Sequence, residues 1–452
     1  MRIFPRFTLA RGVVLGAAGL AVASVIFPTT QASAAVTPTY ATYGAPANFK
    51  GAHDAGEPSI GNNFKSGATM YQGGFYTARV TFNDATTPAT ASWTDVSANA
   101  ASGCPQGSTV SLDPIGYTDH ETGRTFESQL FVKSALTCYT DNDGASWTPT
   151  TGNNPILSGV DHQTMGGGAW APGPTGTSVL YPRSVIYCSQ DIAYANCSVS
   201  RDGGLTYGPA VPIYTLLDCG GLHGHVKVAP DGTIYVPNKD CNGKAGVAVS
   251  GDNGLTWTVR TDPASSVADS DPSVGIGSGG TIYMGYQTPA GPRVAVSANK
   301  GTTWTNDQAV GGNFGIKNAV FPAVVAGDND RAAFAFLGTT TGGDYQAPTF
   351  NGVWHLYVST TFDGGATWTT VDTTPNDPVQ KGSICTGGTT CGQDRNLLDF
   401  MDATIDKQGR VLVGYADGCT GACATGGPEN YDAYATIARQ SGGSTLYAAF
   451  GG

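Results

Sequence analysis

One eight-residue segment, Ser250-Gly-Asp252-Asn-Gly254-Leu-Thr256-Trp257, carries the pattern that decides the fold. The pattern is Ser/Thr, any residue, Asp/Asn, any residue, Gly, any residue, Ser/Thr, aromatic. It occurs at residues 140–147, 200–207, 250–257, 297–304 and 361–368. An Asp or Asn side chain accepts hydrogen bonds from backbone N–H groups of its own turn, and glycine supplies a positive φ. We interpret the copies as structural turns of a repeated β-unit, with the aromatic ring packed on the sheet.

A second, looser repeat sets the number of units. Each unit begins with a short strand that is led by one residue, often followed by Pro. The leading residues are Glu57, Asp113, His162, His225, Asp271, Phe321 and Asp402. A second strand follows in most units, and a third strand runs into the octapeptide. Such four-stranded units match propeller blades.

The sequence therefore predicts an all-β fold, a β-propeller with four-stranded antiparallel blades. We count seven blades, with six as the alternative if the first or second unit is wrongly divided. The seventh unit has no octapeptide, and its last strands are expected at residues 431–439 and 445–450. A closed ring of blades is one cooperative unit, so we predict one propeller domain over residues 53–452, preceded by an N-terminal extension at residues 35–52.

Composition agrees with many short strands joined by tight turns. The 452 residues include 64 Gly and 26 Pro, and only 13% are charged, which argues against a helical bundle or an α/β enzyme. The formal net charge of −11 argues against a phosphate-binding surface, which needs clustered Lys and Arg, so we expect no nucleic-acid partner.

The first 34 residues are typical of a signal peptide. Arg2, Arg6 and Arg11 flank an apolar stretch that is short for a membrane span, and Ala32-Ser33-Ala34 is a small-residue cleavage site. We expect a secreted, extracellular protein that makes no membrane contact after cleavage and is a monomer.

Ten cysteines fit that oxidising destination. We expect disulfides between sequence neighbours, although spacing alone leaves the connectivity open. The expected pairs are Cys104 with Cys138, Cys188 with Cys197, Cys219 with Cys241, Cys385 with Cys391, and Cys419 with Cys423.

The octapeptide resembles the Asp box, or bacterial neuraminidase repeat, of the sialidase superfamily of β-propellers. The five matches extend over most of the chain that follows the signal peptide. The resemblance implies a propeller that acts on or binds glycans, because the superfamily holds glycosidases, lyases and receptors. The Phe/Tyr-Arg-Ile-Pro motif of the sialidases proper is absent, and Arg183 lies in Tyr181-Pro182-Arg183, in the wrong order.

The candidate site follows from the propeller geometry. The inner strands of all blades begin at one mouth of the central channel, so their leading residues should converge there. We predict as catalytic residues Glu57, Asp113, Asp271, Asp402, His162 and His225. We predict as substrate-binding residues His223, Arg395, Tyr286 and Lys239. Blade packing should need neither Asp271 nor His225, so replacing either should leave stability nearly unchanged.

Three functions agree with this residue set, and we expect a carbohydrate partner. The first is a glycoside hydrolase, in which two of the carboxyl groups serve as acid and as base or nucleophile. The second is a polysaccharide lyase acting on a uronic-acid glycan. There a histidine takes a proton, Tyr286 donates one, and Arg395, Lys239 or a calcium ion neutralises the carboxylate. The third is a non-catalytic glycan or protein binder. No motif requires a cofactor, and calcium is the one metal that the lyase hypothesis suggests.

Overall fold

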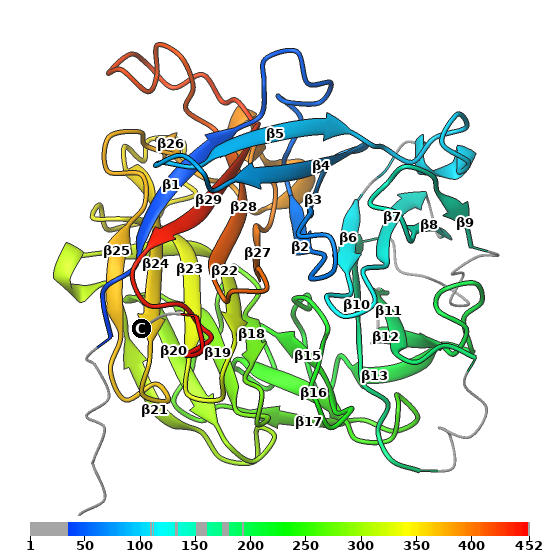
Figure 1. The fold of residues 1–452 in the computed structure, drawn as a ribbon. Coiled ribbons are helices and arrows are strands. Elements are labelled where there is room, and N and C mark those ends of the chain that lie inside the picture. The colour runs from blue at the N-terminus through cyan, green and yellow to red at the C-terminus, as the bar shows by residue number, and fades with distance from the viewer. Residues whose placement is uncertain are drawn as a thin grey trace, which may run out of the picture. The chain divides into compact units, whose positions relative to one another are not determined.

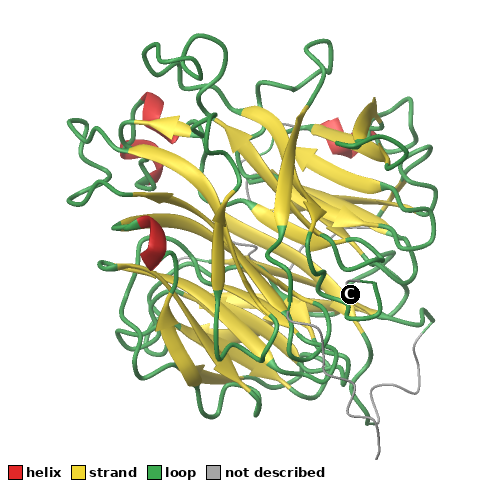
Figure 2. Cartoon of the chain, turned by 60° about the vertical axis from the view of Figure 1, so that its left-hand side comes forward, coloured by secondary structure: helices red, strands yellow, loops and turns green. Residues whose placement is uncertain are grey.

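The computed structural model describes residues 35–108, 111, 113–131, 134–150, 161–173, 180–191 and 194–450. These residues form seven antiparallel sheets that follow one another in chain order (Figure 1). The innermost strand of each sheet contacts the innermost strand of the next, and contacts between β2 and β27 close the ring. Strands dominate, and the helical parts are short 3-10 turns (Figure 2). The predicted seven-bladed propeller is confirmed.

Each blade contains four antiparallel strands, which are given below in order from the channel outward. Blade 1 has β2 (Ser59–Asn62), β3 (Thr69–Gly73), β4 (Tyr76–Asn83) and β5 (Thr90–Asp95). Blade 2 has β6 (Ile115–Thr118), β7 (Thr125–Phe131), β8 (Ser134–Thr140) and β9 (Thr148–Pro149). Blade 3 has β10 (Asp161–Gly168), β11 (Ser184–Gln190), β12 (Tyr194–Ser200) and β13 (Val211–Thr215). Blade 4 has β14 (Lys227–Val228), β15 (Ile234–Asn238), β16 (Gly246–Ser250) and β17 (Thr258–Thr261).

The last three blades complete the ring. Blade 5 has β18 (Ser273–Ile276), β19 (Ile282–Thr288), β20 (Gly291–Ser297) and β21 (Thr305–Ala309). Blade 6 has β22 (Asn318–Ala326), β23 (Ala332–Thr339), β24 (Val353–Thr361) and β25 (Thr369–Asp372), and the short β26 (Gln380–Lys381) also pairs with β24. Blade 7 has β27 (Asp402–Ile405), β28 (Val411–Asp417), β29 (Tyr434–Gly442) and β1 (Thr39–Gly44).

Blade 7 differs from the sequence prediction. Residues 445–450 form turns instead of a strand, and the outer strand is β1, which lies inside the predicted N-terminal extension. Tyr43 pairs with Ile437 in this antiparallel ladder, so the two ends of the propeller are joined by main-chain hydrogen bonds. Because β29 and β1 are remote in sequence, no turn connects them. This explains why the seventh unit has no octapeptide.

The five octapeptides lie between the third and fourth strands of blades 2 to 6. In the copy of blade 4, Gly254 N donates to Ser250 Oγ (2.9 Å), and Thr256 N donates to Asp252 Oδ1 (2.9 Å). Gly254 has a φ of 82°, which explains the invariant glycine of the pattern. The aromatic residue stands directly before the outer strand in blades 2, 4, 5 and 6, and Tyr207 lies a few residues before β13 in blade 3, as expected for a structural turn.

All five expected disulfides are present. Cys188–Cys197 joins directly opposite residues of β11 and β12, and the other four bonds fasten loops or loop ends. Among the described residues, no helix is long and apolar enough to cross a membrane. The predicted signal peptide, residues 1–34, lies outside the described residues.

Candidate functional site

A cavity of about 470 Å³ occupies the central channel and is lined mainly by the inner strands. This volume falls within the range of small-ligand sites. Val226, Val274 and Val324 supply part of the apolar wall. The polar side chains that line the cavity include Tyr117, His120, Glu121, Arg183, His225, Lys227 and Asp402.

The cavity is exposed at one end. Its three exposed lining residues are Glu121, Pro230 and Ser278, and each lies in a turn that follows an inner strand. At the other end, where the inner strands begin, the lining side chains of His225 and Asp402 are only 13% and 12% exposed. Among the described residues, solvent therefore enters from the face on which the inner strands end.

His225, Asp402 and Lys227 form the polar group at the inner end of the cavity. His225 Nδ1 lies 3.6 Å from Asp402 Oδ1, and Lys227 Nζ lies 3.9 Å from the same oxygen. Burial alone would raise the pKa of Asp402, but Lys227 and His225 hold it below its ordinary value. The second ring nitrogen of His225, Nε2, is buried and has no hydrogen-bond partner among the described residues.

Asp402 is also fixed by the backbone. Its Oδ2 accepts a hydrogen bond from Ile60 N of β2 (3.2 Å), and its Oδ1 accepts one from Ala403 N (2.9 Å). The carboxylate therefore joins blades 7 and 1 at the head of the channel. An ionised carboxylate held in this way faces the Nδ1 edge of the His225 ring, which leaves Nε2 as the ring nitrogen that Asp402 does not contact.

A second cluster, the head cluster, contains Glu57, Asp113, His162 and Asp271. His162 Nε2 lies 2.8 Å from Asp271 Oδ2, and Lys239 Nζ lies 3.2 Å from Asp271 Oδ1. Burial alone would lower the pKa of His162, but Asp271, Asp113 and Glu57 raise it to about 10. Burial raises the pKa of Glu57 well above its ordinary value, and Asp113 and Asp399 add to this rise.

The backbone at the heads of the inner strands is unusual. Glu57, His162 and Phe321 have φ values of 54°, 54° and 58°, in the left-handed region that residues other than glycine seldom adopt. The strand register shifts beside His162 and beside Phe321, so both side chains leave the regular alternation of the strand. This bulge turns the His162 ring toward Asp271 of blade 5.

Phe400 lies next to both groups. Its ring centroid is 4.5 Å from that of His225 and 6.2 Å from that of His162, and both contacts are edge-on. The predicted catalytic residues therefore converge at the head of the channel, but they form two groups. His225 and Asp402 line the cavity, whereas Glu57, Asp113, His162 and Asp271 do not. Their catalytic roles stay predictions.

The structure places the four predicted substrate-binding residues outside the cavity lining. Tyr286 is 1% exposed and packs between blades, where its hydroxyl donates to Asp307 Oδ1 (2.8 Å). Its register on β19 turns Tyr286 into the packing between sheets, and its role in substrate binding stays a prediction. Lys239 is held by Asp271, as described above.

Arg395 and His223 have structural partners. Arg395 makes a bidentate ion pair with Asp399 (2.6 and 2.5 Å), and Asp399 N donates to Glu57 Oε1 (3.2 Å). His223 is fully buried, and its Nδ1 lies 3.1 Å from Gly224 O. Burial, with a smaller effect of His162, lowers the pKa of His223 to about 3, so the ring is neutral.

Tyr117, His120, Arg183 and Lys227 line the cavity and were missed by the sequence analysis. Lys227 had a usable signal, because it follows His225 by two residues and alternate residues of a strand share a face. Tyr117 OH donates to Gly167 O (3.0 Å), and burial raises the pKa of Tyr117 well above 10. Arg183 Nε donates to Asp119 Oδ2 (2.6 Å) at the rim.

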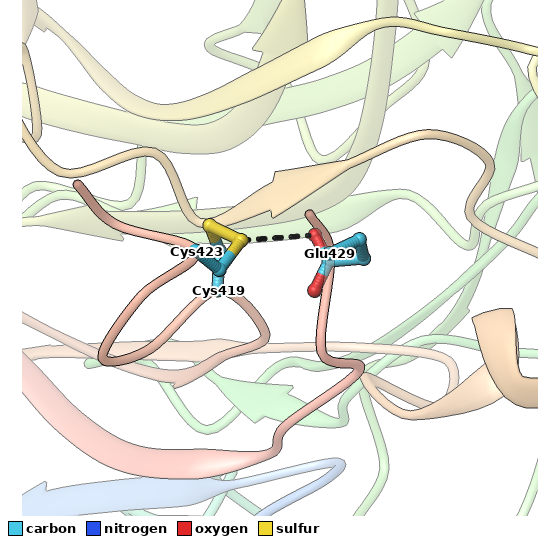
Figure 3. Close-up of side chains that lie close together, drawn as sticks. All are labelled: Cys419, Cys423 and Glu429. Carbon is cyan, nitrogen blue, oxygen red and sulfur yellow. Dashed lines mark hydrogen bonds between the residues drawn. A yellow bond between two sulfur atoms is a disulfide. The ribbon is translucent and has the colours of Figure 1, made fainter. Parts of the chain in front are cut away.

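The described residues do not form a calcium site at the channel. Asp271 is engaged by His162 and Lys239, and both oxygens of Asp402 accept backbone hydrogen bonds. The one group of potential metal ligands among the described residues is Cys419, Cys423 and Glu429 (Figure 3). Its two sulfur atoms are joined in a disulfide, so they are not thiolate ligands.

No model of a known protein family matches the chain, and a search of curated proteins also finds no match. Solved structures with a similar fold include a GH74 enzyme of Niastella koreensis, 18% identical, with a TM-score of 0.48 over 81% of this chain and 52% of that chain. The GH74 xyloglucanase of Xanthomonas campestris is 13% identical, with a TM-score of 0.47 over 84% of this chain and 53% of that chain. The chain thus spans about half the length of these two enzymes.

Sialidases are also among the similar structures. The intramolecular trans-sialidase of Ruminococcus gnavus is 12% identical, with a TM-score of 0.40 over 87% of this chain and 96% of that chain. The Hadza microbial sialidase Hz136 is 14% identical, with a TM-score of 0.42 over 73% of this chain and 65% of that chain. Likenesses of this degree do not define an activity, so the function has to be argued from the channel.

Proposed function

We propose that the protein is a glycan-active enzyme whose channel cavity cleaves a uronic-acid-containing polysaccharide by β-elimination. The observation that carries the proposal is the group at the inner end of the cavity. His225 Nε2 is buried and unpartnered, Asp402 lies on the opposite side of the ring, and Lys227 is close by. An imidazole backed by a carboxylate is an arrangement suited to a general base.

Elimination needs three roles, and the cavity lining offers a residue for each. His225 Nε2 takes the proton from C5 of the uronate, the electrons of that bond form the C4–C5 double bond, and the C4–oxygen bond breaks. Lys227 or Arg183 neutralises the carboxylate, which makes the C5 proton more acidic. Tyr117 OH donates to the leaving oxygen, and for this step it exchanges its hydrogen bond to Gly167 O for one to the substrate. Asp402 acts as a positioning residue.

A second candidate is hydrolysis by a pair of carboxyl groups. Glu57 has a raised pKa, whereas Lys239 and His162 hold the pKa of Asp271 well below its ordinary value despite burial. Opposite shifts of this kind separate an acid from a base in glycosidases. The cavity reaches only Asp402 among the four predicted acids, and for this reason we rank elimination first.

The two reactions give different products. The mature protein is incubated with polygalacturonate, alginate and hyaluronan, and ultraviolet absorbance and new reducing ends are both measured. Elimination gives one unsaturated, absorbing uronate for each new reducing end. New reducing ends without that absorbance would select hydrolysis. Binding without turnover would select the non-catalytic alternative.

A further inference from the structure

We propose that the glycan enters the channel by a chain end, from the face on which the inner strands end, and stops at the residues around Phe400. The enzyme then acts on chain ends instead of internal bonds. The inference rests on the proposed function, but it concerns a separate property of the cavity, namely where it opens and how far it extends.

The exposure of the lining residues gives the direction of entry. Glu121 follows β6, Pro230 follows β14 and Ser278 follows β18, and these are the three exposed residues of the lining. They come from blades 2, 4 and 5, so the opening is surrounded by several blades. Phe64, Tyr117 and Tyr447 also line the cavity and offer apolar or aromatic faces on which a sugar ring can stack.

Buried residues lie at the opposite end. Phe400 is 7% exposed, Met401 is 3% exposed and Leu397 is 2% exposed. Glu57 N donates to Leu397 O (3.3 Å), which fastens this segment to the start of blade 1. The Phe400 ring makes an edge-on contact with the ring of His225, the proposed base. A sugar that reaches His225 therefore meets Phe400 next.

The volume supports the same conclusion. About 470 Å³ is room for a small ligand, and a polysaccharide that bound by an internal segment would need an open passage on both sides. With the described residues around Phe400 buried, a chain can present only one end to His225. The expected products are short and of uniform size.

The entrance can be tested by blocking one face at a time. All ten cysteines are in disulfides, so a single introduced thiol can be labelled selectively. Ser278→Cys places a thiol at the proposed entrance. Thr349→Cys is the matched control, because Thr349 is exposed in the β23–β24 loop, whose Tyr345 hydroxyl donates to Asp269 near the head cluster. Each variant is coupled to a polyethylene glycol maleimide, and the binding of unlabelled tetra-uronides from the three polymers is measured by calorimetry.

We expect the label at Ser278→Cys to abolish binding and the label at Thr349→Cys to leave it unchanged. The proposed entrance would be overturned if only the label at Thr349→Cys abolished binding, or if neither label abolished it. If the polymers are cleaved, absorbance should rise while viscosity hardly falls, and a rapid fall in viscosity would overturn chain-end action. Binding without turnover would refute the elimination reaction. The binding measured with the two labelled variants would still show on which face the glycan enters. No binding of any oligomer would overturn both proposals.

Discussion

Replacing Asp271 by Asn should destabilise the propeller strongly, in contrast to the expectation from sequence that this residue is dispensable for stability. Asp271 is the main counter-charge of His162, at 2.8 Å, and it also faces Lys239 at 3.2 Å. The rise of the His162 pKa from 6.5 to about 10 corresponds to roughly 5 kcal/mol of preference for the imidazolium form. Because Asp113 and Glu57 contribute part of this, we expect Asp271→Asn to cost about 3 kcal/mol at pH 7.

The destabilisation caused by Asp271→Asn should depend on pH. The raised pKa of His162 means that its contribution to stability is fully present below pH 6.5 and is lost as the pH rises through about 10. The lowered pKa of Asp271 means that its contribution is present above its ordinary pKa of 3.8 and is lost at lower pH. The difference between wild type and Asp271→Asn should therefore be largest between about pH 4 and 6.5, should decrease as the pH rises from 6.5, and should be smallest above about pH 10.

Denaturant unfolding at several pH values measures this difference, and proton NMR of His162 follows its titration. In Asp271→Asn the pKa of His162 should fall, because burial then acts with less opposition. His162→Gln and the double variant complete a mutant cycle that isolates the pair. Equal destabilisation at pH 7 and above pH 10, or an unchanged His162 titration, would refute the reasoning.

Three further predictions follow from other parts of the molecule. Tyr286→Phe should leave glycan turnover unchanged and lower the free energy of unfolding by about 2 kcal/mol, because the hydrogen bonds of its hydroxyl with Asp307, Asp262 and Arg293 are lost; a large loss of turnover in a kinetic assay would place Tyr286 in the site. Glu127→Gln should increasingly stabilise the protein relative to wild type as the pH rises from 5 to 9. Burial raises the pKa of Glu127 to about 8, so its contribution to stability is lost as the pH rises through that value, and parallel unfolding curves for the two proteins would contradict this. Treatment with a chelator should change neither turnover nor thermal unfolding, because the described channel acids do not form a calcium site; recovery of activity by added calcium would show otherwise.

The repeat made most of the fold predictable. The octapeptides lie in turns whose chemistry is local, so their positions fix the third and fourth strands of blades 2 to 6. The outer strand of blade 7 could not be found in this way. The pairing of Tyr43 with Ile437 depends on closure of the ring, and no turn residue marks it.

The repeat also made part of the candidate site predictable, because it fixes which residues lead the inner strands. Repeat position alone brings His225 and Asp402 to the head of the channel. The irregular segment that carries Phe400 belongs to no repeat, and so the sequence did not show that the leading residues are divided into two groups. The burial of Tyr286 between sheets could not be predicted, because strand-end position does not reveal which face of the sheet a side chain occupies.

The central claim is that His225 transfers a proton inside the channel, and His225→Gln tests it most directly. The variant is compared with wild type for the formation of unsaturated uronate from the panel of polymers, with thermal unfolding as the control. We expect wild type to form the absorbing product and His225→Gln to be slower by about 10² to 10⁴-fold with nearly unchanged stability. Full activity of a folded His225→Gln protein, or cleavage by wild type without the absorbing product, would contradict it.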